Sequence, residues 1–322
     1  MNTFLTLVCL FLLVSGNSQV TPKVITTSSE KDLIPEGIAV DPRTGKMYVT
    51  SIASHKILTV DTNGNCKDFI LSDEYGFLEG LGMKVDVKRN LLWALSNKRN
   101  GKWFTSQVHA FDLGSSKAKH FYSIKDTIPH LFNDLDIDEQ GNIYLTDTHY
   151  SAVYFLDTRK RKLDLCLRNN LTMYPNGIAL GKNNQLFIAT YKNGIVKIDL
   201  KKKMSGLLIG VKDSIKSHGL DGLVFSNNSL IGVYNYNIYD STGFAICAII
   251  KYSLNEKGNV IKEELIDNDN PHYVEPTTLC VTGKKLFVLA NSHLAAYNAN
   301  KESTKGIEHQ LKPITILQYQ LQ

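Results

Sequence analysis

The chain has 322 residues and a formal net charge of +5 at pH 7, and 43% of its residues are hydrophobic. That hydrophobic share is ordinary for a globular protein and excludes both a disordered chain and one built of membrane-spanning segments. The basic runs Arg159–Lys162 and Lys201–Lys203 are short, and no basic stripe with interleaved aromatic residues accompanies them. Nucleic-acid binding is therefore not expected.

The chain begins with an apolar run, Phe4–Val14, followed by small and polar residues. This run is too short to span a bilayer and suits the apolar core of a secretory signal peptide. We predict cleavage after Gly16 or Ser18, with a signal peptide over residues 1–18 and the mature chain over 19–322. No later stretch is long and apolar enough to be transmembrane. The mature protein is expected to be secreted, to the extracellular space or to a bacterial periplasm.

Export would permit disulfides among the four cysteines that follow the signal peptide. Their positions are Cys66, Cys166, Cys247 and Cys280. No spacing resembles a zinc site or a CxxC motif. Buried free thiols and disulfides both remain open.

The rest of the chain consists of short alternating runs separated by turn residues, which indicates a β-sandwich, barrel or propeller. One hairpin unit recurs six times. The copies are PEGIAVDPRTGKMYVTS from Pro35, GLGMKVDVKRNLLWALS from Gly80, FNDLDIDEQGNIYLTDT from Phe132, PNGIALGKNNQLFIATY from Pro175, LDGLVFSNNSLIGVYN from Leu220 and EPTTLCVTGKKLFVLAN from Glu275. Successive copies begin 43 to 55 residues apart, the length of a four-stranded blade.

Each hairpin is followed by a third alternating run and, in five copies, by a weaker fourth. The predicted third strands are Lys56–Asp61, Gln107–Leu113, Ala152–Asp157, Gly194–Leu200, Ala248–Leu254 and His293–Asn298. The predicted fourth strands are Asp68–Leu71, Lys119–Ile124, Leu163–Leu167, Gly206–Gly210 and Val260–Ile266. The last blade takes its outer strand from Ile314–Tyr319, from Val24–Thr27, or from both.

The prediction is an all-β fold, a single six-bladed β-propeller with four-stranded antiparallel blades. Six blades cover one another's faces and leave only short edges. Two longer insertions, Asn97–Ser106 and Tyr236–Phe244, are expected between the second and third strands of their blades.

The start of each innermost strand carries the main functional signal, because these positions converge on the axis of a propeller. The six equivalent residues are Glu36, Leu81, Asn133, Asn176, Asp221 and Pro276. Four of them, Glu36, Asn133, Asn176 and Asp221, carry side-chain oxygens, and we call these four residues the ring. Such a set of oxygens suits a hard cation such as calcium. The absence of histidine and cysteine argues against zinc or copper. The alternative is that Asn and Asp serve only as turn formers before strands, although Glu36 is a poor turn residue.

The motifs Pro35-Glu36-Gly37, Asn133-Asp134, Pro175-Asn176-Gly177 and Asp221-Gly222 resemble the calcium-binding signature of the SMP-30/gluconolactonase family. The related paraoxonases and diisopropyl-fluorophosphatase share that set of calcium-binding residues. The resemblance implies a six-bladed propeller with one calcium ion at the central axis, held by Glu36, Asn133, Asn176 and Asp221. Family members commonly hydrolyse lactones, and some hydrolyse phosphotriesters or aryl esters.

The chain departs from this family pattern at Leu131. Members that act on sugar lactones have an arginine there, two residues before the equivalent of Asn133, so a sugar lactone is in doubt. We expect an exported calcium-dependent hydrolase of lactones or related esters that acts on a small molecule. The alternative is a secreted propeller that binds a ligand or protein and whose calcium is purely structural.

Asp221 is the predicted catalytic residue, as general base for the attacking water or as a nucleophile that forms an acyl-enzyme. Three histidines near the ring, His130, His149 and His218, are other candidate bases, although an ordinary loop role is the simpler interpretation of each. Glu79 and Glu275 lie one or two residues from the six equivalent inner-strand positions. They either form a second acidic rim or are solvated loop carboxylates.

Overall fold

The computed structural model of the protein describes residues 21–27, 30–211, 220–235, 247–268 and 270–321. The predicted signal peptide, His218 and the insertion predicted at Tyr236–Phe244 lie outside these residues. None of the helices described is long and apolar enough to cross a membrane.

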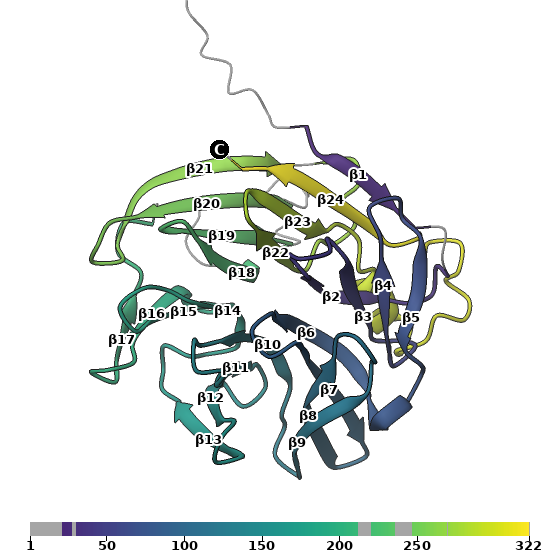
Figure 1. The fold of residues 1–322 in the computed structure, drawn as a ribbon, viewed down its shortest axis with the longest axis horizontal. Helices are drawn as coiled ribbons and strands as arrows, with labels where there is room; N and C mark the ends of the chain where they lie inside the picture. Colours follow the sequence, from purple (N-terminus) through teal and green to yellow (C-terminus); the bar gives the residue numbers. More distant parts are fainter. Residues whose placement is uncertain (1–20, 28–29, 212–219, 236–246, 269, 322) are drawn as a thin grey trace, which may run out of the picture.

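Six four-stranded antiparallel sheets surround a central axis, which confirms the predicted six-bladed propeller (Figure 1). In the first five blades the strands follow one another in chain order from the axis outward. Blades 1 and 2 are β2 (Pro35–Val40), β3 (Met47–Ser51), β4 (Lys56–Val60) and β5 (Cys66–Ile70), then β6 (Glu79–Asp86), β7 (Leu91–Asn100), β8 (Trp103–Asp112) and β9 (Ala118–Asp126). Blade 3 is β10 (Phe132–Ile137), β11 (Ile143–Asp147), β12 (Ala152–Asp157) and β13 (Lys162–Leu167).

Blades 4 and 5 continue the same pattern. Their strands are β14 (Pro175–Leu180), β15 (Gln185–Thr190), β16 (Gly194–Asp199) and β17 (Met204–Leu207), then β18 (Leu220–Ser226), β19 (Ser229–Tyr234), β20 (Ala248–Leu254) and β21 (Val260–Asn268). All five predicted fourth strands are therefore present, with bounds that shift by a few residues.

The sixth blade joins the two ends of the chain. It consists of β22 (Leu279–Thr282), β23 (Lys285–Leu289), β24 (Thr315–Gln320) and, outermost, β1 (Lys23–Thr26). Both segments considered for its outer strand are thus used, with β24 third and β1 fourth. The pairing of β1 with β24 closes the ring.

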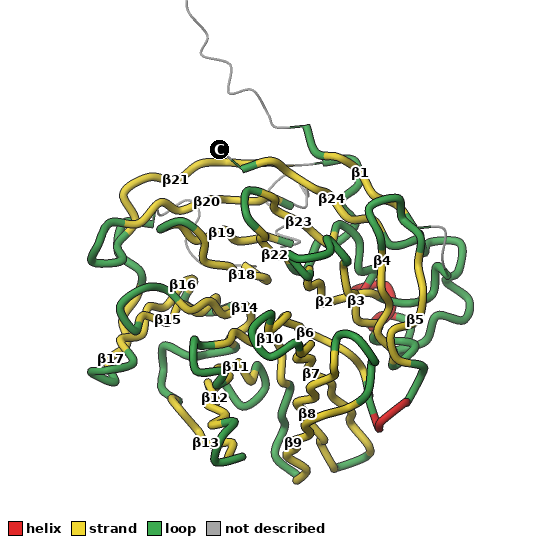
Figure 2. Tube along the Cα trace, viewed as in Figure 1, coloured by secondary structure: helices red, strands yellow, loops and turns green. Residues whose placement is uncertain are grey.

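The third strand predicted at His293–Asn298 is wrong, because this segment forms the helix α1 (Leu294–Ala299), drawn in red in Figure 2. His293, at φ 61, is in the left-handed region and breaks the extended chain. The helix contains three alanines, the residue with the highest helix propensity. A 3-10 turn, η1 (Glu74–Gly76), connects blades 1 and 2.

The insertion predicted at Asn97–Ser106 lies between the second and third strands of blade 2, as expected, but it does not form a loop. β7 and β8 stay paired as far as Asn100 and Trp103, so the extra residues lengthen one hairpin, which turns at Gly101 with φ +60. The end of β7 at Asn97–Arg99 lines a cavity at the axis. The longer hairpin of blade 2 therefore contributes to one wall of that cavity.

One apolar cluster fills each interface between neighbouring blades. Trp93 of blade 2 is an example: it is fully buried and packs in one cluster with Phe132 of blade 3. These interfaces fix the angle between neighbouring sheets. They therefore set where the starts of the inner strands meet.

Candidate metal centre

The four predicted ligand residues come from four inner strands and line a single cavity of ≈ 440 Å³. Each is almost fully buried, with exposed fractions of 6% for Glu36, 8% for Asn133 and 4% for both Asn176 and Asp221. Leu81 lines the same cavity. The six-fold repeat in the sequence thus placed these residues correctly relative to one another.

A shared irregularity in the strands turns these side chains toward the axis. In β2, Pro35 pairs with Ser51 and Ile38 pairs with Val49, so the register shifts across Glu36. The same shift occurs at the equivalent place in β6, β10, β14 and β18. Such bulges re-aim a side chain out of the regular pleat. The ring residues lie inside strands, so the turn-former explanation of these positions is wrong.

Glycines directly after ring residues allow the inner strands to approach closely. A Cβ added to Gly37 would lie 2.1 Å from the carbonyl oxygen of Leu81 in the next blade. A Cβ added to Gly177 would lie 2.5 Å from the carbonyl oxygen of Asp221. The Glu-Gly and Asn-Gly dipeptides therefore serve the contact between blades rather than a turn.

Threonine hydroxyls bind the backbone carbonyls of two residues at the equivalent inner-strand positions, Leu81 and Asn176. Thr146 donates to the Asn176 carbonyl at 2.6 Å and accepts from the Asp134 amide at 3.1 Å. Thr50 bridges Gly37 and Leu81 in the same way. These two carbonyls are therefore engaged by the protein itself. Aligned threonines in the second strands were the sequence signal for this feature.

Hydrogen bonds also fix which way the two ring amides point. The Thr148 hydroxyl donates its proton to the Pro175 carbonyl at 2.6 Å, so it can only accept from Asn133 Nδ2, 3.0 Å away. The oxygen of Asn133 therefore points away from Thr148. Asn176 Nδ2 similarly donates to the Tyr191 hydroxyl at 2.7 Å.

The ring carboxylates are destabilised in their charged form. Burial raises the pKa of Glu36 well above its usual value, and the charges of Asp221 and Asp134 raise it further. Burial and Glu275 raise the pKa of Asp221, although hydrogen bonds from the side chains of Asn176 and Asn235 lower it in part. Buried like charges favour either protonation or a bound cation.

The residues present fit a calcium ion. Two carboxylates and two side-chain amides line one buried cavity, and calcium accepts both ligand types. In the parts of the chain that the structure describes, no group of three or more His, Cys, Asp or Glu side chains is placed to hold a metal. An ion in this ring would therefore depend on the amides of Asn133 and Asn176.

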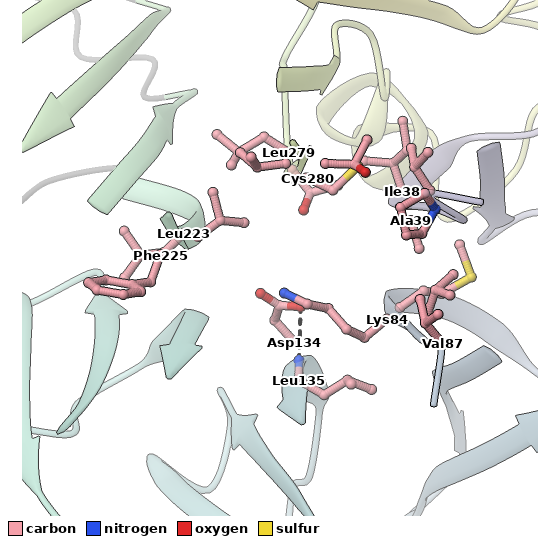
Figure 3. Close-up of a pocket in the computed structure, with 18 residues that line it drawn as sticks. Ile38, Ala39, Lys84, Val87, Asp134, Leu135, Leu223, Phe225, Leu279 and Cys280 are labelled. Atoms are coloured by element: carbon pink, nitrogen blue, oxygen red, sulfur yellow. Dashed lines mark hydrogen bonds between the residues drawn. The ribbon is translucent and has the colours of Figure 1, made fainter. Parts of the chain in front are cut away.

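The opposite end of the axis carries a cation of the protein's own. There Lys84 Nζ lies 3.1 Å from Asp136 Oδ1, and Figure 3 shows its ammonium beside the Asp134 carboxylate. Burial raises the pKa of Asp134 to about 7, against the opposing effect of Lys84. The backbone amides of Ile178 and Leu180 donate to these two carboxylates. This cluster ties blades 2, 3 and 4 together below the ring.

Of the two candidate histidine bases that the structure describes, His130 is held between carboxylates and His149 lines the cavity. Both nitrogens of His130 face carboxylates, Nδ1 at 2.5 Å from Asp147 and Nε2 at 3.5 Å from Asp126. Burial would lower the pKa of His130, but Asp147 and Asp126 outweigh it and raise that pKa. His130 also lines the cavity, and its two contacts link β9 of blade 2 to β11 of blade 3. His149 lines the cavity, and burial lowers its pKa.

The two candidate rim carboxylates are both engaged. Glu79 lines the cavity but forms an ion pair with Lys98, at 2.7 Å. Glu275 accepts from the Ala295 amide at 2.7 Å and so anchors the first turn of α1. Sequence reasoning missed α1 as a wall of the cavity, because its residues were assigned to a strand.

Comparisons with known proteins place this geometry in a family. A family model described as the SMP-30/gluconolactonase/LRE-like region matches residues 34–228. No curated protein sequence matches the chain.

Solved structures share the fold at low sequence identity. A gluconolactonase from Xanthomonas campestris has a TM-score of 0.60 at 13% identity, over 92% of this chain and 89% of its own. A virginiamycin B lyase from Staphylococcus aureus has a TM-score of 0.60 at 14% identity, over 94% and 99%. A calcium-binding protein, regucalcin, from Agrobacterium tumefaciens has a TM-score of 0.58 at 13% identity, over 94% and 96%.

These neighbours are named for different activities, so the shared fold alone does not assign one. The family match covers more than half of the chain and includes all four ring residues. The resemblance expected from the ring motifs is thereby confirmed. The chain belongs to the SMP-30/gluconolactonase/LRE-like family.

Proposed function

We propose that the protein is an exported calcium-dependent hydrolase of lactones or related esters, with metal and substrate at the propeller axis. The observation that carries this proposal is the buried ring of Glu36, Asn133, Asn176 and Asp221 in one cavity. Family membership supports a lactonase-type reaction. A cavity of ≈ 440 Å³ lies within the range of small-molecule sites.

These four residues would hold one calcium ion, which when bound supplies Lewis-acid polarisation of the ester carbonyl. Asp221 then acts as the general base that takes a proton from the attacking water. The water oxygen bonds to the carbonyl carbon of the lactone, the C–O bond within the lactone cycle breaks, and the leaving oxygen takes up a proton. The products are a carboxylic acid and an alcohol joined in one molecule.

The groups around Asp221 suit this role. Asn235 Nδ2 donates to Asp221 Oδ2, which orients the carboxylate. The raised pKa of Asp221, caused first by burial, makes it a better proton acceptor than a solvated aspartate. Calcium binding would reduce that basicity, so reactive esters such as lactones suit the site better than amides.

Export rests on the apolar run Phe4–Val14 and the small residues that follow it. The propeller's first strand, β1, begins at Lys23. Cleavage after Gly16 or Ser18 would therefore leave every described strand intact. N-terminal sequencing of the protein recovered from culture medium or periplasm tests this part of the proposal.

The hydrolase proposal is tested with Asp221→Asn and Glu36→Gln, assayed on lactones, aryl esters and phosphotriesters with and without chelator. The wild type should retain about one calcium ion per chain and hydrolyse at least one class. Each variant should lose the ion and at least about 100-fold in kcat/KM. Asp164→Asn, on the outer strand of blade 3, is the matched control and should lose neither.

A binding propeller with a purely structural calcium is the second candidate. Leu131 favours it, because no arginine is present there to hold a polar substrate group. Tight calcium binding with no turnover across the whole panel would support this candidate. Turnover that survives complete calcium removal would contradict the proposed mechanism.

A further inference from the structure

The segment between β23 and β24 forms a cap over one side of the cavity. It contains α1, and its residues Leu294, Tyr297, Asn298 and Glu302 line the same cavity as the ring. In the other blades the loop between the second and third strands contributes no helix among the residues described. We call residues 293–311 the cap.

The cap is fixed in place at both ends. Its first turn is held by Glu275, which accepts from the Ala295 amide. The amide of Lys312 donates to His293 Nε2 at 3.2 Å. After the helix, Asn300 Nδ2 donates to the carbonyls of Ser303 and Lys305. The cap therefore has an ordered structure of its own.

Leu131 belongs to the apolar cluster beneath the cap. The cluster joins the cap to blades 1, 2 and 3; its buried members are Ile34, Ile52, Leu81, Tyr297, Ile307 and Leu311, and Leu131 and Leu294 pack against them. Leu131 is also only two residues before Asn133 of the ring. An apolar surface thus begins directly beside the proposed metal ligands.

The cavity has two chemically different sides. Its apolar side is formed by five side chains: Ile52, Leu81, Leu131, Leu294 and Tyr297. The other side includes Arg99 and Lys98, and Lys98 is paired with Glu79 at 2.7 Å. A hydroxyl group placed against Ile52, Leu81 or Leu131 would lose its water without gaining a hydrogen-bond partner from these side chains, which costs free energy. A methylene group placed there would gain free energy.

We infer that the cap and Leu131 form a subsite for the hydrocarbon substituent of the substrate, whose ester carbonyl faces the ring. The substrate class is then a lactone or ester with an aliphatic side chain, rather than a polyhydroxylated sugar lactone. This inference rests on the proposed function and specifies its substrate. Leu131 and Tyr297 are the residues that determine specificity.

The test is a series of γ-lactones with side chains of zero to six carbons, compared with glucono-δ-lactone. The wild-type kcat/KM should rise about three- to fourfold per added methylene until the apolar side is covered, since each buried methylene contributes about 0.8 kcal/mol. Leu131→Ala and Tyr297→Ala should flatten that rise. Leu165→Ala, at an exposed position on the outer strand of blade 3, should leave it as in the wild type.

A second measurement separates this inference from the hydrolase proposal. The corresponding γ-lactams resist hydrolysis, so their affinity, measured by calorimetry, does not depend on turnover. Affinity that rises with chain length in the wild type and not in Tyr297→Ala supports the subsite even if no lactone is hydrolysed. Hydrolysis that favours the sugar lactone, or that ignores chain length, overturns the subsite while leaving the hydrolase proposal standing.

Discussion

At the scale of single residues, the ring combines side chains that are unfavourable together without a cation. Glu36 and Asp221 are buried, and each raises the cost of ionising groups around it. The side-chain nitrogens of Asn133 and Asn176 donate hydrogen bonds to the hydroxyls of Thr148 and Tyr191. The four side chains therefore line a cavity in which negative charge would accumulate.

This arrangement predicts a pH dependence of stability that calcium removes. Because the pKa values of Glu36 and Asp221 are raised in the folded protein, the calcium-free fold binds protons more readily than the unfolded chain. Its free energy of unfolding should therefore fall as pH rises from about 4, the unfolded pKa, through the raised values. Saturating calcium displaces these protons and should flatten the fall.

The measurement is urea unfolding between pH 4 and 8, with chelator and with calcium. Glu36→Gln should reduce the slope in chelator, whereas Asp164→Asn should not. Identical slopes with and without calcium would contradict an ion in this ring.

The sequence was sufficient to predict that the four ring residues lie together at the axis, but not what surrounds them. Glu36, Asn133, Asn176 and Asp221 stand at the same place in a repeat, so one alignment brings them together. Long-range pairings such as His130 with Asp147, or Glu275 with α1, have no local pattern. They depend on how separate loops fold back, which spacing alone does not determine.

At the scale of the elements, the bulged inner strands and the threonines of the second strands position the ring. Thr146 connects β11 of its own blade to both β10 and β14. The hydroxyl is fully buried, so water cannot replace it. One side chain thus holds the inner strands that carry Asn133 and Asn176.

Removing that hydroxyl should therefore destabilise the protein and weaken the site together. Thr146→Val keeps the shape but leaves the Asp134 amide and the Asn176 carbonyl without this partner, which costs about 2 kcal/mol. Thr59→Val removes an exposed hydroxyl bonded to the Lys67 carbonyl at 3.2 Å and should cost less than about 0.5 kcal/mol. Denaturant unfolding and calcium affinity are the readouts. Equal effects of the two substitutions would exclude a special role for Thr146.

Strand prediction failed where one blade departs from the repeat. The third strand of blade 6 was assigned to His293–Asn298, but the chain first forms the cap and returns as β24. The residues of α1 alternate too weakly to separate strand from helix, and in the structure the helix packs on Ile52 and Leu81. The form of the insertion in blade 2 was unpredictable for a different reason: the same number of residues can form a loop or lengthen a hairpin.

At the scale of the whole molecule, the sixth blade is built from segments near both ends of the chain, and this closes the circle of blades. β1 pairs with β24, so the first described strand completes the last blade. Ile25 of β1 is buried in the cluster between blades 6 and 1. The sequence predicted six blades from repeat length, and left open only which segment closes them.

The propeller axis has two different ends. The ring of oxygen ligands lies where the inner strands begin, and the Lys84 cluster lies where they continue toward their other ends. The Lys84 ammonium supplies positive charge at the far end. At the near end no such group of the protein pairs with Glu36 or Asp221 among the ion pairs that the structure describes. A metal ion would complete the charge balance there.

The most direct test of this account is a calcium titration of the metal-free protein that follows bound calcium and lactone hydrolysis in the same samples. Activity should rise in proportion to occupancy and reach its plateau at about one ion per chain. Asp221→Asn should neither bind the ion nor gain activity. Full activity before any calcium is bound, or a fully occupied ring without turnover of any lactone or ester, would contradict the proposed calcium-dependent hydrolase.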